Sequence, residues 1–414
     1  MVLDTFVLGL SALSFAELDV LKSSSEIFYG FAMSSKAILS DFRFTIEPLP
    51  SLDELEPQWR CLDIRGSHSF FVTWTWIGTW LRCVQPLDGL MLLRLLSGSE
   101  VIGLSILRAA RSQDNWGPSI QQVWLNSTGK SGLDGITIEH NGFALSPNVV
   151  RVPWLEFSDW FLGEDLGAEL ILPGLDTNAF AGPTNRLLAI HECKNGYRIP
   201  LQKATFTEGA LSLRSRNSRQ KLRKSMRDFQ SKGPLVLEVA PDEKCAQDFF
   251  SGLKELHIAS WTRRGRRHAF SKPFFELFHR ALISRGIAER SVELMRISAG
   301  SQILGYLYNF RRNGTVLSYQ SGFDDSSRGA RPGYVSHALA IAHYAAEGAQ
   351  YYDFLAESNR LKQSFALEQY EMSWWRLRKP TLRFRTEALA RRLLIRYRRP
   401  GWSIVRVDDS GQVN

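Results

Sequence analysis

The sequence predicts an α/β (α+β) fold made of two similar domains in tandem, each a mixed, mostly antiparallel sheet flanked by helices. The chain has 414 residues, which is too long for one small domain and long enough for two cores. Its 44% hydrophobic and 22% charged residues are typical of a globular protein. One ten-residue pattern, at 94–103 and again at 296–305, reads each time as strand, glycine turn and strand. This repetition favours a duplication, with chance similarity between two hairpins as the alternative.

The second copy continues with a regular alternation of elements. Asn313-Gly314 is a strong turn signal because both residues tolerate positive φ. Helical spacing of Tyr334, Ala338 and Ile341 predicts an amphipathic helix. The expected order is a strand at 303–310, a turn at 312–314, a strand at 315–323, a polar loop at 324–333, a helix ending at Gly348 and a strand at 351–355.

A basic helix is predicted upstream, at residues 215–232, before a strand at 235–239. Leu222, Met226 and Phe229 would form its apolar face. Arg219, Arg223 and Arg227 follow at i, i+4 and i+8 as a cationic stripe. This stripe is either a solvated surface or a contact for donor phosphates or an anionic acceptor, and we name Arg219 and Arg223 as candidate substrate-binding residues.

In the order of its motifs, the run from Arg216 to Trp375 resembles the GNAT acyltransferases, in the branch of CelD-like and FemAB-like proteins. The matching elements are RQKLR at 219–223, WTRRG at 261–265, GFD at 322–324, Pro-Gly at 332–333, YDF at 352–354 and LKxxF at 361–365. The N-terminal half resembles the family more loosely. The resemblance implies an acceptor-side domain at 43–205 and a donor-side catalytic domain at 206–378, between a flexible extension at 1–42 and a basic tail at 379–414.

The loop before the predicted helix is the expected donor site. Amides at a helix start are unsatisfied and attract anions, which applies here to Gly333, Tyr334 and Val335. Arg328 and Arg331 would add charge-assisted contacts to a pyrophosphate. The family's usual Q/R-x-x-G-x-G/A loop is altered here, because its first glycine is displaced and a proline intrudes. Lys362 matches a lysine of the family pattern and is expected to contact donor or acceptor.

Acyl transfer needs a base for the attacking group and an acid for the leaving group. We expect Glu357 to be the base, with Asp353 as a second carboxylate in the same strand region. Tyr319 is the candidate acid, and a packed core tyrosine is the alternative. A predicted strand carries Glu139, His140 and Asn141, which we assign to acceptor binding, although adjacent strand residues face opposite sides unless the strand breaks at Asn141-Gly142.

A formal charge of +9 favours anionic partners without choosing among them. The four cysteines form no CxxC pair and lie at no metal-ligand spacing, so we expect no metal and a cytoplasmic location. The strongly basic tail from Arg376 to Arg399 could form a basic helix on the inner face of a membrane or a solvated terminal helix. Nucleic acid is an unlikely partner, since no recognition motif is present.

Three functions remain open at this stage. The first is transfer of an acyl group, typically acetyl, from acyl-CoA to an amine or hydroxyl of a sugar, nucleotide-sugar or amino-acid-like acceptor. The resemblance places that reaction in polysaccharide or envelope synthesis. The second is a Fem-like peptidyltransferase that uses aminoacyl-tRNA, which the positive charge permits. The third is a non-catalytic protein that binds nucleic acid or a membrane surface.

Overall fold

The computed structural model describes residues 42–395 and 403–405, except 65, 67, 87, 113–118, 150, 178–179, 181, 183–185, 204–205, 208–209, 212–214 and 327–328. The predicted extension at 1–42 therefore lies outside the described residues, apart from Phe42, which begins the first strand. The N-terminal half comprises β1 (Phe42–Pro48), α2 (Leu52–Asp63), α3 (Trp74–Val84), β2 (Leu90–Ser97), β3 (Glu100–Ser112), β4 (Ile120–Leu125), β5 (Ala144–Leu145), α4 (Trp154–Gly163), β6 (Glu169–Asp176) and β7 (Leu188–Pro200).

The C-terminal half comprises β8 (Phe206–Thr207), β9 (Ala210–Leu211), α5 (Arg216–Gln230), β10 (Leu235–Val239), α6 (Glu243–Arg263), α7 (Pro273–Gly286), β11 (Val292–Ala299), β12 (Gln302–Arg312), β13 (Thr315–Phe323), α8 (Pro332–Ala346), β14 (Tyr351–Ala356), α9 (Arg360–Phe365), β15 (Glu368–Arg378), α10 (Leu382–Ile395) and β16 (Ser403–Val405). The strands expected at 235–239 and 315–323 occur at those residues. The helix expected at 215–232 is α5, whose first turn is capped by the Ser215 hydroxyl accepting from the Ser218 amide.

One continuous sheet runs through both halves, in the order β1-β2-β3-β4-β6-β15-β7-β14-β13-β12-β11-β10. Each half contributes four antiparallel strands followed by one parallel neighbour: β4 pairs with β6, and β13 pairs with β14, in parallel. The repeated hairpin has the same irregularity in both copies. Its register shifts after Leu95 in the first copy and after Ile297, the aligned residue, in the second. The predicted fold class is therefore confirmed.

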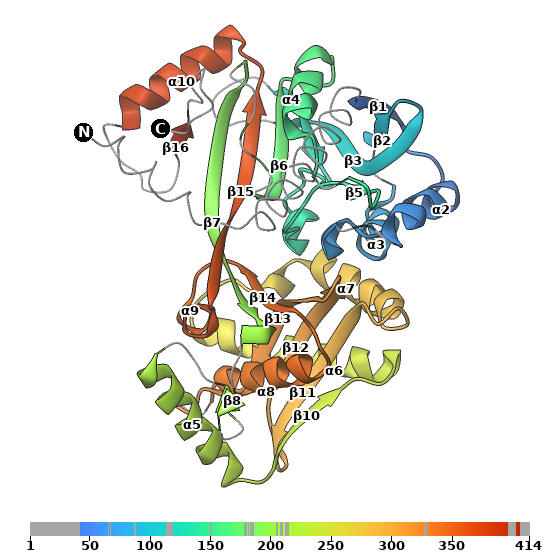
Figure 1. Ribbon diagram of the computed structural model, residues 1–414. Coiled ribbons are helices and arrows are strands. Elements are labelled where there is room, and N and C mark those ends of the chain that lie inside the picture. Colours follow the sequence, from blue (N-terminus) through green and yellow to red (C-terminus); the bar gives the residue numbers. More distant parts are fainter. Residues whose placement is uncertain are drawn as a thin grey trace, which may run out of the picture.

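The two halves exchange strands where they meet. Strand β7, from the N-terminal half, pairs with β14, while β15, from the C-terminal half, pairs with β6. These two long strands also pair with each other along most of their length and connect the upper and lower parts of Figure 1. The domain boundary at 205/206 remains a prediction, since residues 204–205 are outside the description and the paired strands lie across that division.

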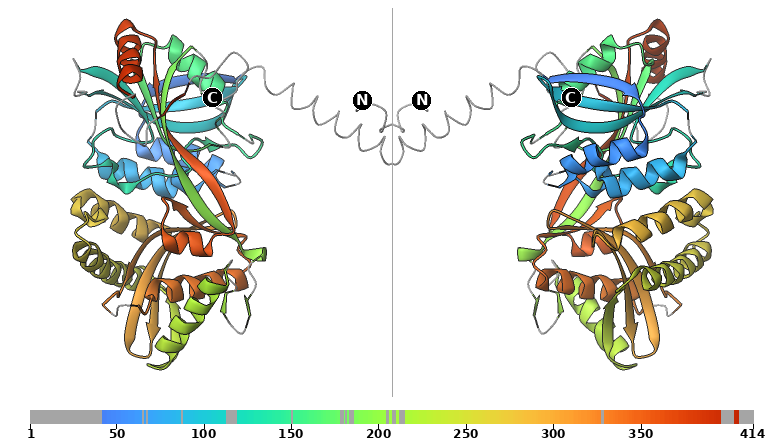
Figure 2. Two further views of the ribbon diagram at one scale, coloured as in Figure 1. Left: turned by 90° about the vertical axis from the view of Figure 1, so that its left-hand side faces the viewer. Right: turned by 90° about the vertical axis from the view of Figure 1, so that its right-hand side faces the viewer.

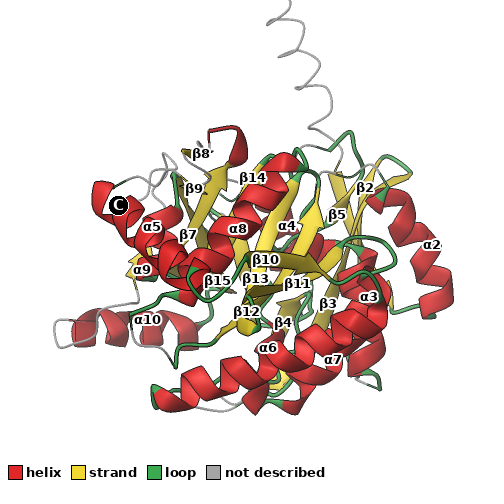
Figure 3. Ribbon diagram, turned by 90° about the horizontal axis from the view of Figure 1, so that it is seen from below, coloured by secondary structure: helices red, strands yellow, loops and turns green. Residues whose placement is uncertain are grey.

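Helices cover both faces of the C-terminal sheet. Helices α6 and α7 lie on one face, and α8 and α5 lie on the other (Figure 3). The apolar face of α5 is buried as predicted, with Leu222 and Phe229 in one core with residues of α8. The two halves are stacked on each other (Figure 2), and α3 contacts α7 between them.

Aromatic side chains from both halves pack into one core at this junction. Phe70 stacks on Phe310 with ring centroids 4.4 Å apart, and Trp76 meets Phe278 edge-on at 4.8 Å. All four rings are at most 1% exposed. Aromatic pairs of this kind contribute roughly 0.5–1.5 kcal/mol beyond their buried area. The core therefore fixes the N-terminal half against the C-terminal strands.

We expected a strand around Glu139 and His140, and this prediction is wrong. Residues 137–143 form an irregular loop, in which Thr137 and His140 have φ values of 39° and 47°. These left-handed conformations break the alternation that a strand imposes. As a result, Glu139 and His140 reach the same region of the molecule despite being adjacent.

Candidate active site

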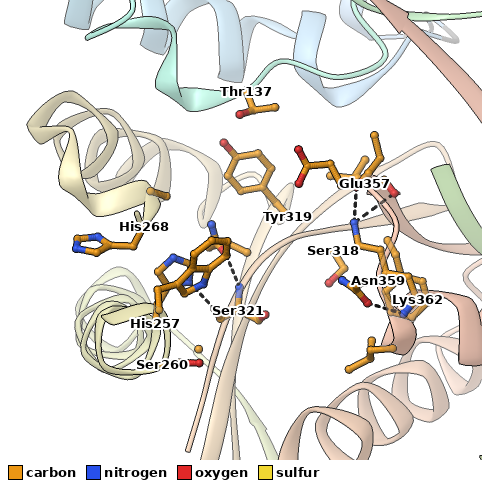
Figure 4. A pocket seen from close by; sticks show the side chains of 18 of the residues that line it. Thr137, His257, Ser260, His268, Ser318, Tyr319, Ser321, Glu357, Asn359 and Lys362 are labelled. Carbon is orange, nitrogen blue, oxygen red and sulfur yellow. Dashed lines mark hydrogen bonds between the residues drawn. The ribbon is translucent and has the colours of Figure 1, made fainter. Parts of the chain in front are cut away.

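Strands β13 and β14 pair for three residues and then separate. Their parallel register runs from Thr315 opposite Tyr351 to Leu317 opposite Asp353. A register shift on the other side of β13 leaves Tyr319 without a partner on β12. A cavity of about 1340 Å³ lies where the strands diverge, and residues 318–323 and 354–357 line it (Figure 4).

Both halves of the chain contribute walls to this cavity. The C-terminal part of α6 and the connection to α7 form one side, which includes His257, Ser260 and His268 (Figure 4). Residues 359–362 of α9 form the opposite side. The loop of the N-terminal half closes the cavity with Asp134, Gly135, Thr137 and Glu139. The cavity therefore lies at the junction of the two halves.

Glu139 is a buried carboxyl group at the cavity surface, 7% exposed. Its Oε2 accepts a hydrogen bond from the amide of Ala356, at 2.8 Å, which ties the N-terminal loop to the end of β14. Burial raises the pKa of Glu139 above its ordinary value, against the opposing attraction of Lys362 and His140. A carboxylate with a raised pKa suits proton abstraction near neutral pH.

Lys362 faces the same cavity from α9. Asn359 caps this short helix by accepting from the Lys362 amide at 2.9 Å. The Lys362 ammonium donates to the carbonyl oxygens of Leu355, at 3.4 Å, and Ala356 (Figure 4). Burial lowers its pKa, and attraction to Glu139 is the largest opposing effect. Glu139 and Lys362 therefore line the same cavity and attract each other, and burial shifts their pKa values toward each other.

Asp353 does not line the cavity. It is 3% exposed, and burial raises its pKa. Its Oδ1 accepts from the amide of Leu355, at 2.7 Å, and from the hydroxyl of Tyr370, at 2.9 Å. Leu355 has a φ of 63°, so this bond holds an uncommon backbone conformation. Asp353 therefore orients the peptide groups that receive the Lys362 ammonium.

His140 and Asn141 also lie outside the cavity lining. The His140 ring is 3.1 Å from the Tyr370 hydroxyl. The Asn141 side chain donates to the carbonyl of Leu125 at 3.2 Å and accepts from the amide of Gly142 at 2.8 Å. Both residues hold the loop that carries Glu139. Their assignment to acceptor binding remains a prediction.

Glu357 lines the cavity at its exposed edge. Its side chain is 75% exposed and pairs with Lys194 at 3.4 Å. Tyr319 projects into the cavity beside Thr137 (Figure 4). Its hydroxyl donates to the carbonyl of Ile136, and burial raises its pKa well above the ordinary value. A hydroxyl so engaged is a poor proton donor to a leaving group, although the predicted catalytic roles of both residues remain untested.

The expected donor loop precedes α8. Arg328 lies outside the described residues, while Arg331 is the N-cap with a φ of 54°. Pro332 has no amide hydrogen, and the Tyr334 amide bonds to the Arg331 carbonyl at 3.1 Å. Anion binding at this helix start would therefore depend mainly on Arg331 and on the Gly333 amide. The Val335 side chain is fully buried, so only its backbone could take part.

Arg219 and Arg223 lie on α5, which packs against α8, and neither belongs to the cavity lining. Their role in substrate binding also remains a prediction. A further cavity residue, His337, was not assigned a function from sequence. Its Nδ1 is 2.9 Å from the Tyr352 hydroxyl, and burial lowers its pKa to about 3. His337 is therefore a neutral imidazole at neutral pH.

Metal-holding clusters and membrane-spanning helices are both absent from the described part of the chain. No cluster of three or more His, Cys, Asp and Glu side chains there is arranged to hold a metal ion. Among the described helices, none has both the length and the apolar character needed to cross a membrane.

The site is thus a strand pair that opens into a cavity, with a buried carboxyl group and an ammonium group in its lining. Residues 216–363 match the family model of the acetyltransferase (GNAT) domain. The C-terminal half therefore contains a GNAT domain, and the recognition made from its motifs is confirmed.

Other comparisons show more distant similarity. A comparison with curated proteins finds no relative. Among solved structures, FemX is 9% identical with a TM-score of 0.45, over 80% of this chain and 96% of that chain. A tandem GNAT protein from the clavulanic acid biosynthesis pathway is 14% identical, with a TM-score of 0.41, over 82% and 100%. A GCN5-related N-acetyltransferase from Kribbella flavida is 12% identical, with a TM-score of 0.30, over 81% and 71%. These similarities are too weak to indicate a substrate.

Proposed function

We propose that the protein transfers an acyl group, typically acetyl, from acyl-CoA to an amine or hydroxyl of a small acceptor. The observation that supports this most is that Glu139 and Lys362, whose charges attract each other, both line the cavity between β13 and β14. One group comes from each half of the chain. Neither half alone would therefore bring the two groups into one cavity.

The cavity fits a donor with an extended arm. Beyond Leu317, β13 has no strand partner on its β14 side, so backbone groups there would be available to a pantetheine amide, except at Ser321, whose amide donates to Gln320 Oε1 and whose carbonyl contacts the His257 ring. Arg331, the N-cap of α8, and Arg360, in the cavity lining on α9, are the cations that would contact the donor's phosphates. The volume of about 1340 Å³ exceeds that of typical single-ligand pockets, roughly 300–1,000 Å³, so it can hold donor and acceptor together.

The chemistry assigns one task to each member of the pair. Glu139 takes the proton from the acceptor's nitrogen or oxygen as that atom bonds to the acyl carbonyl carbon. The Lys362 ammonium stabilises negative charge, first on the carbonyl oxygen and then on the departing sulfur. The carbon–sulfur bond breaks, and the departing sulfur receives the proton that Glu139 took from the acceptor, which regenerates the neutral thiol and the Glu139 carboxylate. Charge stabilisation in a buried site is much stronger than it would be in water.

The acceptor class follows from the sequence resemblance. We propose a sugar, nucleotide-sugar or amino-acid-like molecule of polysaccharide or envelope synthesis, with the protein in the cytoplasm or at the inner face of the membrane. The aminoacyl-tRNA-dependent reaction is the competing function, and both would use the same cavity.

Calorimetry with CoA and acetyl-CoA tests the donor. We expect binding by the intact protein that is weakened by Arg331→Glu and by Lys362→Met. Arg43→Glu is the matched control, because Arg43 is an exposed cation of β1, outside the cavity lining. Absence of binding, or binding unchanged by both Arg331→Glu and Lys362→Met, would overturn the proposal. So would acyl transfer from charged tRNA by a protein that fails to use acyl-CoA.

A further inference from the structure

A chain of three side chains, of which Tyr308 and His279 are fully buried and Tyr319 partly buried, connects the C-terminal core to the loop that carries Glu139. The Tyr319 hydroxyl donates to the carbonyl of Ile136, three residues before Glu139. On its other side, Tyr319 Oη lies 3.2 Å from Nε2 of His279. The other ring nitrogen of His279, Nδ1, lies 3.3 Å from the hydroxyl of Tyr308. The chain therefore runs from β12 through α7 and β13 to the N-terminal loop.

The direction of each hydrogen bond in this chain is determined. A carbonyl oxygen can only accept, so the hydrogen of Tyr319 points to Ile136. Tyr319 Oη must then accept from His279 Nε2–H. His279 is fully buried, and burial lowers its pKa well below the ordinary value, so the ring is neutral and its Nδ1 carries no hydrogen. Nδ1 consequently accepts from the Tyr308 hydroxyl, and every member of the chain is satisfied.

Packing leaves these side chains little freedom to move. The Tyr319 ring lies 4.9 Å from Phe310 and 6.0 Å from Trp76, between the cores of the two halves. His279 is enclosed by Phe275 at 4.3 Å. A hydrogen-bonded hydroxyl in such surroundings is a fixed anchor, since moving it would leave buried polar groups unpaired.

We propose that Tyr319 is a positioning residue that fixes the N-terminal loop at Ile136 and thereby sets the place of the Glu139 carboxyl in the cavity. This inference rests on the proposed function, because it concerns the same reaction. It differs from the role of leaving-group acid predicted from the sequence. An acid would lose its proton in each turnover, whereas an anchor keeps its hydrogen bond to Ile136 throughout.

The Tyr319→Phe variant tests the anchor, because it removes one hydroxyl and keeps the ring. We expect kcat to fall about 10- to 100-fold, the cost of displacing a catalytic group by about 1 Å, with the KM for acyl-CoA unchanged. The acidic limb of the pH–rate profile should also move, since the environment of Glu139 changes. Hydrogen exchange measured by mass spectrometry should be faster in residues 134–142.

Two further variants make the test specific. Tyr308→Phe removes the donor to His279 and should have a smaller effect of the same kind, even if Tyr319→Phe folds poorly. Tyr306→Phe is the control, because this hydroxyl lies in the same half but outside the chain and the cavity lining. Unchanged exchange in residues 134–142 together with an unmoved pH profile in Tyr319→Phe would overturn the inference. A loss of activity in Glu139→Gln in that case would leave the proposed function intact, whereas full activity of Glu139→Gln would refute the role of Glu139 itself.

Discussion

The two parallel strand pairs, β4/β6 and β13/β14, begin alike and end differently. Each pair is in register for three residues, 122–124 with 169–171 and 315–317 with 351–353. Past this point β13 and β14 border a cavity. Past the same point in the N-terminal half, the loop at 137–143 fills the space. The Asn141 amide donates to the carbonyl of Gly174 in β6, at 2.9 Å, and its side chain donates to Leu125 in β4, at 3.2 Å.

In the N-terminal half, the loop at 137–143 packs closely against β6. A Cβ on Gly174 would lie 2.4 Å from the carbonyl oxygen of Ile138, so backbone of the loop packs directly on β6. This contact occupies the position that the donor's arm would take in the C-terminal copy. The same loop, which is held between β4 and β6, places Glu139 at the cavity between β13 and β14. Under the proposed function, the N-terminal copy thus supplies a catalytic group to the cavity of the C-terminal copy.

The largest effect that would sharpen this comparison is expected from Glu139→Gln. Removing the base should lower kcat by about 10²- to 10⁴-fold, the usual range for general acid–base catalysis, with donor affinity nearly unchanged. Steady-state kinetics and calorimetry measure the two quantities. Glu357→Gln is the matched variant, because its carboxyl group lines the same cavity but is 75% exposed. A large loss in Glu357→Gln with none in Glu139→Gln would reverse the assignment in favour of the base expected from sequence.

A moderate effect on stability is expected when the loop at 137–143 loses its contacts with β4 and β6. Asn141→Ala removes a buried amide that bonds to Leu125 and to the amide of Gly142. Leaving buried partners unsatisfied should lower the free energy of unfolding by about 1–3 kcal/mol. Asn217→Ala, at an exposed position of α5, should change it by less than about 0.5 kcal/mol. Denaturant titration measures the free energy of unfolding of both variants. Equal stability of the two would contradict the view that Asn141 holds the loop at 137–143 in place.

The smallest effect concerns the pH dependence. Burial raises the pKa of Glu139, so the rate should increase with pH through a value above that of an ordinary glutamate. Burial lowers the pKa of Lys362, so the rate should fall again below the pH at which an ordinary lysine loses its proton. Measurement of kcat/KM against pH should give a bell narrowed from both sides. An acidic limb at the ordinary glutamate value would show that a solvated carboxylate is the base.

The sequence could predict what depends on local pattern. Alternation and turn chemistry located β13, and helical spacing located α5 with Leu222 on its buried face, because both signals lie within a few residues. The place of Glu139 could not be predicted in the same way. Its loop takes positive φ at Thr137 and His140, which are not glycines, and its contact with Ala356 spans 217 residues. The hydrogen bond from Tyr319 to Ile136 depends equally on tertiary packing, so the contact of this tyrosine with the loop could not be predicted from local pattern.

The exchange of β7 and β15 sets an order on the assembly of the chain during its synthesis. Strand β6 ends at Asp176, but its neighbour β15 begins only at Glu368. When the first half of the chain has emerged from the ribosome, its sheet therefore has an open edge at β6. Such edges readily pair with other chains. The N-terminal half can close only when almost the whole polypeptide has emerged. Chain termination shortly before Glu368 would remove the strand that joins the halves, and with it Trp374 of the cavity lining, although Glu139 and Lys362 would both have been made.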